Sequence, residues 1–168
     1  MVDDVRVAVV MGVSGSGKTT LARALAGAWP ATFLDADDFH DAQAKARMAG
    51  GEPLTDAMRD PWAQRIADDL RQRVAAGERV SLAFSGLRRR HRDMLRVAGV
   101  PMRFLFLQGE RTLVAQRMQA RSGHYMPVSL LDSQFDALEP PRGESDVHAI
   151  AIDAPPARIL EQALAALA

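Results

Sequence analysis

Short apolar runs alternate with longer segments of helical periodicity along most of the chain. A strand buried on both faces of a parallel sheet is apolar at nearly every position, because helices cover the sheet from two sides. On that pattern we expect five strands, at Val5–Met11, Thr32–Asp35, Val80–Phe84, Arg103–Leu107 and Ala149–Ile152. The remaining periodic segments predict helices at Lys18–Trp29, Ala42–Ala49, Pro61–Ala76, Thr112–Arg121 and Pro156–Ala168. This alternation is typical of an α/β three-layer sandwich.

One long stretch, Gly123–Val147, has only weak periodicity. It is interrupted by Pro127, Pro140, Pro141 and Gly143. We predict a lid or mobile segment around residues 117–147, within a single domain that spans residues 1–168.

Composition narrows the classes of function. The 168 residues carry 21 basic and 21 acidic side chains, and this neutral balance argues against a nucleic-acid partner. The chain has no cysteine, which excludes disulfides, thiolate metal sites and a thiol nucleophile. No apolar stretch approaches the ~20 residues of a membrane span, so no membrane partner is expected. We see no export signal and expect a cytoplasmic protein.

Residues 12–19, between the first expected strand and the first expected helix, read Gly-Val-Ser-Gly-Ser-Gly-Lys-Thr. This is the phosphate-loop pattern G-x-x-x-x-G-K-[ST] in the strand–loop–helix context that it requires. Glycines let the backbone N–H groups turn onto phosphate oxygens, and the helix start adds positive partial charge. We expect Lys18 to reach the β- and γ-phosphates of ATP and Thr19 to bind Mg²⁺. The predicted nucleotide-binding residues are Gly12, Val13, Ser14, Gly15, Ser16, Gly17, Lys18, Thr19 and Thr20.

Three carboxylates, Asp35, Asp37 and Asp38, follow the second expected strand. Ligands of open parallel sheets bind beyond the carboxyl ends of the strands, so these groups should lie beside the phosphate loop. Asp37 is the candidate that orients or deprotonates an attacking hydroxyl, and Asp35 or Asp37 could help to hold Mg²⁺ through water. The alternative is a solvated acidic turn that caps the next helix.

Two pairs of arginines have the i, i+4 spacing that places side chains on one face of a helix. Arg88 and Arg92 could clamp a carboxylate or a phosphate, to which the planar guanidinium binds through two hydrogen bonds. Arg117 and Arg121 could neutralise the charge of a migrating phosphoryl group. The alternatives are solvated charges in the first case and the polar face of an amphipathic helix in the second.

Taken together, several of these segments resemble the bacterial-type gluconokinases, which are small P-loop carbohydrate kinases. The matching stretches run from residue 5 to about residue 145, and they are Gly12–Thr20, Asp35–His40, Met48–Asp56, Arg59 with Pro61 and Trp62, Ser85–Asp93, Arg117–Met126, Ser133–Phe135 and Leu138 with Glu139. The phosphate loop is shared with many unrelated enzymes, whereas the stretch around Arg59 and the Arg121–Tyr125 stretch are much more specific.

The resemblance implies a nucleoside-kinase-like fold with a five-stranded parallel sheet and a lid. It also implies a homodimer that uses ATP and Mg²⁺ to phosphorylate D-gluconate to 6-phospho-D-gluconate. It places Lys18, Asp37, Arg117 and Arg121 at the reaction centre. It assigns the substrate site to Asp37, Arg88, Arg92 and His124, and we add His40 from the same matching stretch as a predicted substrate-binding residue.

The chain departs from the family pattern at Phe84, Gly86, Arg88, His91 and Met58. Another sugar acid, a cyclitol or a shikimate-like hydroxy acid therefore stays open as the acceptor. A nucleotide-binding ATPase without kinase activity is the alternative from a different class, and it would have no need of acceptor-side residues such as Asp37 and Arg88.

Overall fold

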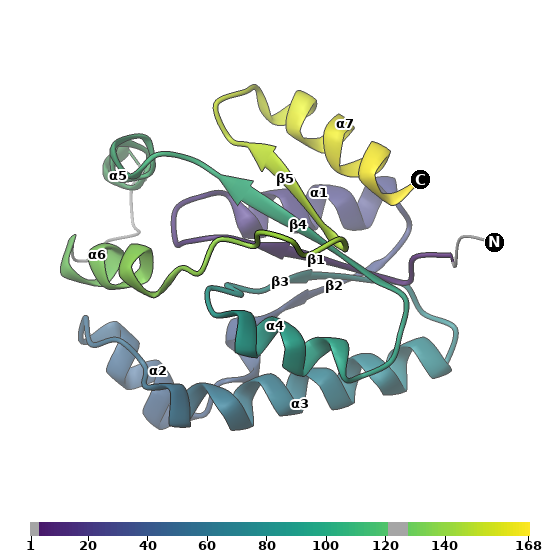
Figure 1. Ribbon diagram of the computed structural model, residues 1–168, viewed down its shortest axis with the longest axis horizontal. Helices are drawn as coiled ribbons and strands as arrows, with labels where there is room; N and C mark the ends of the chain where they lie inside the picture. The colour runs from purple at the N-terminus through teal and green to yellow at the C-terminus, as the bar shows by residue number, and fades with distance from the viewer. Residues whose placement is uncertain (1–3, 121–127) are drawn as a thin grey trace.

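The computed structural model describes residues 4–120 and 128–168. Five parallel strands form one sheet in the order β2-β3-β1-β4-β5 (Figure 1). The strands are β1 Val7–Met11, β2 Thr32–Asp35, β3 Val80–Ala83, β4 Met102–Gln108 and β5 Val147–Ala151. All five expected strands are present, and their ends differ from expectation by at most two residues. The predicted α/β sandwich is confirmed.

Seven α-helices and one 3₁₀ helix, η1, occur in the described residues. They are α1 Lys18–Ala28, η1 Ala36–Phe39, α2 Ala42–Ala49, α3 Asp56–Ala75, α4 Arg89–Arg96, α5 Arg111–Ala120, α6 Val128–Ala137 and α7 Pro156–Leu167. The helix α6 lies in the stretch of weak periodicity, where no helix was predicted. The short helices α4 and η1 add to the five helices that periodicity located.

Helix α3 begins five residues before the predicted start at Pro61. The side chain of Thr55 accepts a hydrogen bond from the Met58 N–H at 3.2 Å and caps the helix there. Pro61 therefore lies inside the helix, where its ring nitrogen cannot donate to the carbonyl of Ala57. The prediction was wrong because the Thr55 cap sets the start and the helix tolerates one missing hydrogen bond.

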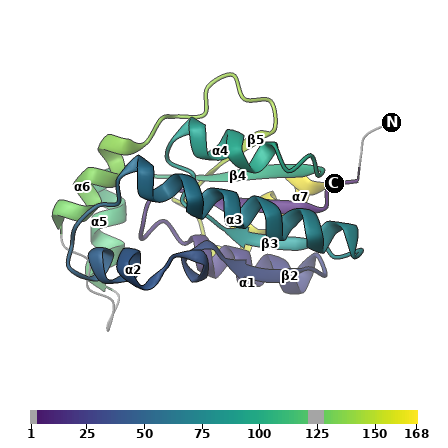
Figure 2. The same ribbon diagram turned by 90° about the horizontal axis from the view of Figure 1, so that it is seen from below.

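The sheet separates two apolar cores. Along β1, Ala8 and Val10 face a core completed by α1 and α7, while Val7, Val9 and Met11 face a core completed by α3 and α4. Figure 1 shows these helix pairs on opposite sides of the sheet. In both ribbon views α2, α5 and α6 gather at the end toward which the strands point, opposite the C-terminal end of α7 (Figure 2). The candidate site lies at that end.

Within residues 4–120 and 128–168, every helix is too short or too polar to cross a membrane.

Candidate active site

The phosphate loop joins β1 to α1, and its path depends on glycine. Gly12 and Gly15 have φ angles of 152° and 80°. A Cβ atom on Gly12 would lie 2.8 Å from the Ser16 Oγ, and one on Gly15 would overlap the side chain of Met118. Both positions therefore favour glycine. The motif predicts glycine at Gly12, whereas Gly15 falls on one of its unspecified positions.

Inside the loop, the carbonyl oxygen of Val13 accepts three hydrogen bonds. The donors are the Ser16 N–H at 3.2 Å, the Ser16 Oγ at 2.7 Å and the Lys18 Nζ at 3.1 Å. These bonds curl the loop, and they hold the Lys18 ammonium group over it. The first turn of α1 has no acidic residue, and no described side chain caps it. Its N–H groups and the helix dipole therefore present a positive site for an anion.

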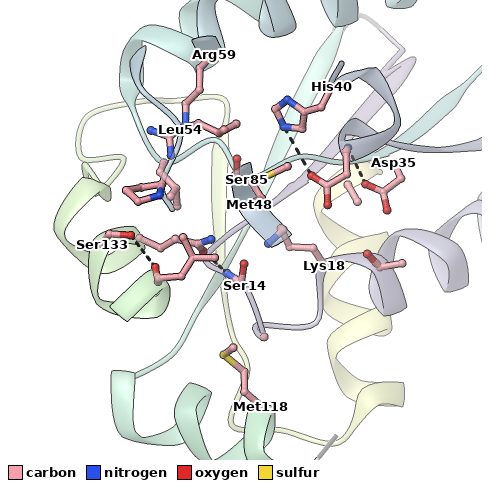
Figure 3. A pocket seen from close by; sticks show the side chains of 18 of the residues that line it. Ser14, Lys18, Asp35, His40, Met48, Leu54, Arg59, Ser85, Met118 and Ser133 are labelled. Carbon is pink, nitrogen blue, oxygen red and sulfur yellow. Dashed lines mark hydrogen bonds and ion pairs between the residues drawn. The ribbon is translucent and has the colours of Figure 1, made fainter. Parts of the chain in front are cut away.

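A cavity of about 810 Å³ opens in front of this loop (Figure 3). Its walls come from elements far apart in the sequence: the loop and α1, the β2–η1 turn, the start of α3, the end of β3, α5 and α6. The polar side chains that line it include Lys18, Thr19, Arg23, Asp35, Asp37, His40, Arg59, Ser85, Ser133 and Gln134. A volume of this size lies in the usual range for small-molecule sites.

The β2–η1 turn carries Asp35 and Asp37 to the cavity. The Asp35 carboxylate accepts a hydrogen bond from the Asp37 N–H at 2.9 Å, which caps η1. Burial raises the pKa of Asp35; the Asp37 N–H lowers it, and the charges of Asp37 and Asp38 raise it. The Asp37 side chain is 75% exposed. Asp35 is thus partly shielded at the sheet end, while Asp37 is open to an incoming ligand.

An aromatic stack supports this turn from behind. The His40 ring lies 4.3 Å from the Trp62 ring at 12°, and Trp62 in turn lies 5.0 Å from Phe84. The Trp62 Nε1–H donates to the carbonyl of Ala36 at 2.7 Å, which fixes the turn between the two aspartates. Helix α3 therefore sets the position of the acidic turn through Trp62.

His40 is almost fully buried beside Asp37, with 4.0 Å between the Nε2 of His40 and the Oδ1 of Asp37. Burial, with the charges of Arg65 and Arg59, lowers the pKa of His40 to about 4. The ring is therefore neutral at pH 7. The described residues offer no hydrogen-bond partner to the buried Nδ1 of His40.

Arg59 brings positive charge to the same cavity from α3. Its side chain is 17% exposed and lies 3.9 Å from the Asp56 carboxylate. Burial lowers the pKa of Arg59, Asp56 opposes this, and the charge of Arg88 lowers it further. Arg59 and Arg88 each have a carboxylate only at 3.9 Å, and two neighbouring guanidinium groups favour an anion beside them. Composition and spacing did not single out Arg59, and its only sequence signal is the stretch that it shares with gluconokinases.

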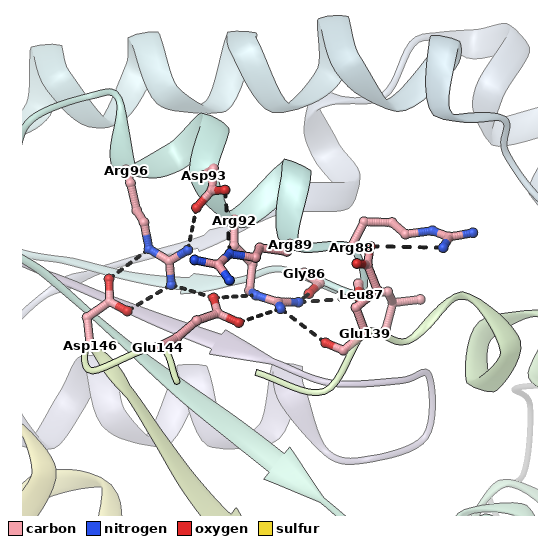
Figure 4. Close-up of polar contacts among 10 residues, drawn as sticks. All are labelled: Gly86, Leu87, Arg88, Arg89, Arg92, Asp93, Arg96, Glu139, Glu144 and Asp146. Atoms are coloured by element: carbon pink, nitrogen blue, oxygen red, sulfur yellow. Dashed lines mark hydrogen bonds and ion pairs between the residues drawn. The ribbon is translucent and has the colours of Figure 1, made fainter. Parts of the chain in front are cut away.

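The predicted clamp of Arg88 and Arg92 is wrong. Arg88 occupies the N-cap position of α4 with φ −96° and ψ 136°, so its backbone is not helical and the i, i+4 argument does not apply. Arg92 is fully buried and is not among the described residues that line the cavity. Figure 4 shows its side chain among Glu144, Glu139 and Gly86. It pairs with Glu144 at 2.7 Å, and its other acceptors are the carbonyl oxygens of Gly86, Leu87 and Glu139.

Arg88 remains near the site, although it is not among the described residues that line the cavity. Its Nη1 lies 3.9 Å from Glu139, and its buried Nε has no hydrogen-bond partner. The charge of Arg88 contributes to lowering the pKa of Arg59. Arg88 can therefore act with Arg59, and not with Arg92, on an anionic ligand.

Arg117 lies on the other side of the phosphate loop, in a mostly apolar cavity of about 300 Å³. Its Nη2 donates to the carbonyl of Ile152 at 2.7 Å. The walls of this second cavity include Gly15, Thr20, Leu21, Leu107, Pro156 and Ile159. An apolar slot beside a phosphate loop suits the base of a nucleotide. Arg121 and His124 lie outside the described residues.

The residues present fit a magnesium ion that is shared with a nucleotide. Thr19 and Asp35 line the same cavity, and Lys18 is close enough to lower the pKa of Asp35. The described residues contain no group of three or more histidine, aspartate or glutamate side chains that could hold a metal alone. Mg²⁺ in nucleotide sites is held by one or two protein oxygens together with phosphates and water, which matches this arrangement.

Comparison with known proteins agrees with this geometry. The chain matches the AAA domain family over residues 7–141. The thermosensitive gluconokinase of Escherichia coli (strain K12) is 41% identical over 155 residues, which make up 92% of this chain and 83% of the relative.

Two solved structures are similar over nearly the whole length. A gluconokinase from Sinorhizobium meliloti 1021 has a TM-score of 0.88 at 42% identity, covering 95% of this chain and 90% of that one. A sugar kinase from Janibacter sp. HTCC2649 has a TM-score of 0.90 at 40% identity, covering 97% and 94%.

The chain is a P-loop kinase. The parallel sheet, with the phosphate loop at its carboxyl end, agrees with the relatives on this class. Relatives at about 40% identity cover most of the chain and narrow the assignment. The chain belongs to the gluconokinase family.

Proposed function

We propose that the chain transfers the γ-phosphoryl group of ATP to a primary hydroxyl of D-gluconate, giving 6-phospho-D-gluconate. The observation that carries the proposal is one cavity in which the phosphate loop faces Asp37 and Arg59. Relatives of this length and identity are named gluconokinases, which supports the choice of acceptor.

On the nucleotide side, the N–H groups of the phosphate loop and the Lys18 ammonium group bind the phosphates. Thr19 and, through water, Asp35 hold Mg²⁺, which when bound neutralises phosphate charge. The base occupies the apolar cavity beside Arg117. Arg117 and Arg121 neutralise charge during transfer in this proposal, with Arg117 acting from the base side of the loop.

On the acceptor side, Asp37 accepts a hydrogen bond from the attacking hydroxyl and takes its proton as transfer proceeds. Neutral His40 lies next to Asp37 and brings no positive charge to it at pH 7. Arg59, assisted by Arg88, attracts the gluconate carboxylate. His124 contributes to the acceptor site only as the family resemblance implies.

The direct test measures ADP release with D-gluconate, with other sugar acids, with neutral polyols and with shikimate. We expect turnover on D-gluconate of about 1–100 s⁻¹, the usual range for kinases. Mass and NMR analysis should locate the phosphate on the primary hydroxyl. ADP release that does not depend on any acceptor would contradict the proposal.

We also propose a homodimer in the cytoplasm, on the basis of the gluconokinase family. Sedimentation equilibrium of the purified chain tests the assembly, with twice the mass of 18.3 kDa expected. Fractionation of the source cells tests the location.

A further inference from the structure

A side chain of helix α6 forms a hydrogen bond with the phosphate loop. The backbone N–H of Ser14 donates a hydrogen bond to the Oε1 of Gln134 at 2.6 Å, across 120 residues of sequence. Gln134 is half-buried and lines the large cavity together with Leu130 and Ser133. The proposed mechanism does not use this residue.

The position of Gln134 is fixed by contacts at several points of α6. Leu131 is buried in the core, and Asp132 pairs with Arg111 of α5. Just past the helix, the N–H of Glu139 donates to the carbonyl of Leu87 at 2.7 Å, and Arg92 donates to the Glu139 carbonyl at 3.0 Å. These contacts therefore hold α6, and with it Gln134, in a fixed position at the cavity.

An amide side chain has one acceptor and two donors. The Ser14 N–H occupies the Oε1 of Gln134, which assigns the amide orientation and leaves the Nε2 group to donate. No hydrogen bond from Nε2 is found among the described groups, which exclude residues 121–127 and the side chains of residues 128 and 129. A half-buried donor that lines a substrate cavity without a protein acceptor is suited to a ligand oxygen.

The cavity that Gln134 lines favours the acceptor over the nucleotide base, since Gln134 lines the large cavity together with Asp37 and is not among the described residues of the apolar cavity beside Arg117. Figure 3 shows Ser133 of α6 across the cavity from Asp35 and His40, on the wall that faces the acidic turn. The N–H groups of Lys18 and Thr19 begin α1 and have no partner within the helix, so phosphate can bind there without displacing Gln134. A polyhydroxy acid held between Asp37 and α6 would present its hydroxyl oxygens to Nε2.

We propose that Gln134 determines acceptor specificity by donating a hydrogen bond from Nε2 to one hydroxyl oxygen of the sugar acid, while its Oε1 remains on Ser14. This inference rests on the proposed gluconate kinase activity. It assigns to α6 the recognition of one acceptor hydroxyl, in addition to its structural contact with the loop.

The test combines enzyme variants with acceptor analogues. Gln134→Met removes both hydrogen bonds, whereas Gln134→Glu keeps an acceptor for the Ser14 N–H and cannot donate. Asp136→Asn is the matched control, since Asp136 is exposed on the same helix and is not among the described residues that line the cavity. Each protein is assayed with D-gluconate and with a set of single-deoxy gluconates, and ATP affinity is measured separately.

We expect Gln134→Glu to lower kcat/KM for gluconate about 2- to 13-fold, the size of one lost hydrogen bond. Gln134→Met should lose at least as much, because it also removes the contact with Ser14. Gln134→Met should keep its ATP affinity within about threefold, and Asp136→Asn should match the wild type. One deoxy analogue should be about tenfold poorer than gluconate for the wild type but equal to gluconate for Gln134→Met, which is the signature of a direct contact.

Wild-type kinetics for Gln134→Glu would show that the Ser14 contact alone matters and would overturn the inference. So would a deoxy penalty that is the same in wild type and Gln134→Met at every position. If the wild type phosphorylates gluconate in either case, the proposed function stands. If the wild type does not phosphorylate gluconate at all, both proposals fall together.

Discussion

Asp37 and Asp38 are neighbours on η1 and have the same charge. The described residues that line the large cavity include Asp37 but not Asp38. We expect Asp37→Asn to lower kcat about 10²- to 10⁴-fold, because a carboxamide cannot take a proton from the acceptor hydroxyl. Asp38→Asn should stay within about twofold of the wild type. Steady-state assays with saturating ATP and gluconate make the comparison, and equal losses in the two variants would contradict the role of Asp37.

Arg59 allows a second test at the scale of one side chain. The substitution Arg59→Gln removes the positive charge. It should lower kcat/KM for gluconate about 10- to 150-fold, the range for a hydrogen bond to a charged group. Turnover of a neutral polyol should change little, because it has no carboxylate to lose. The exposed Arg89→Gln is the control. A loss that is equal for charged and neutral acceptors would mean that Arg59 only maintains the structure of α3.

At the scale of elements, the contact between η1 and α3 links stability to pH through His40. The pKa of His40 in the folded protein is about 4, below its ordinary value of 6.5, because the ring is buried near Arg65 and Arg59. As the pH falls below 6.5, the unfolded chain therefore binds a proton before the folded chain does. The free energy of unfolding should fall from about pH 6.5 toward pH 4, and His40 has no effect above that window.

His40→Phe separates this contribution from the others. Phenylalanine can keep the stack on Trp62, and the change leaves no buried donor unpaired, since the Nδ1 of His40 has no partner among the described residues. Urea unfolding at pH 8, 6.5 and 5 should show a shallower acid slope for the variant. Some slope should remain, because burial also lowers the pKa of His91. An unchanged slope would contradict the assignment to His40.

The link between α4 and the segment before β5 depends on a buried ion pair. Burial would raise the pKa of Glu144, but hydrogen bonds from Arg92 and Arg96 outweigh it and lower the pKa. Arg92→Met should lower the free energy of unfolding by about 3 kcal/mol, near the lower end of the usual range because Arg96 still pairs with Glu144. Arg89→Gln, which removes an exposed pair with Asp93, should cost less than about 1 kcal/mol.

The double variant Arg92→Met with Glu144→Gln is the check on this reasoning. It removes the buried charge that the single change leaves behind, and it should recover part of the lost stability in chemical denaturation. If the double variant is less stable by the sum of the two single effects, the pair does not act as a unit.

Across the whole molecule, much of the fold could be predicted from local sequence patterns, which involve only residues close together in the chain. Apolar runs located the strands, and the motif from Gly12 to Thr19 located the phosphate loop. The acidic turn could be placed beside that loop because parallel strands end at one edge of the sheet. Family resemblance supplied the reaction class, which the relatives confirm.

The rest depended on pairings between distant residues, for which the sequence has no local signal. Arg92 was assigned to the substrate because its partner Glu144, 52 residues away, could not be inferred. Gln134 and its partner Ser14 are even further apart in the sequence, by 120 residues. Arg59 was missed because a single arginine acquires a role only when α3 turns it toward the cavity. Side-chain partners across the tertiary structure therefore limited the prediction of the site.

Ligand binding to the native state should stabilise the whole domain. At a free Mg²⁺–ATP concentration of 100 Kd, linkage adds about 2.7 kcal/mol, or about 5–10 °C in Tm for a chain of this size. Lys18→Ala should abolish most of this shift, because Lys18 and the loop N–H groups bind the phosphates together. The chain has one other lysine, Lys45, which is exposed on α2, so Lys45→Ala is a matched control that should keep the full shift. Differential scanning fluorimetry with and without nucleotide measures it. A full shift in Lys18→Ala would mean that ATP binds elsewhere. The proposed transfer from a nucleotide on the phosphate loop to an acceptor in the large cavity would then be wrong.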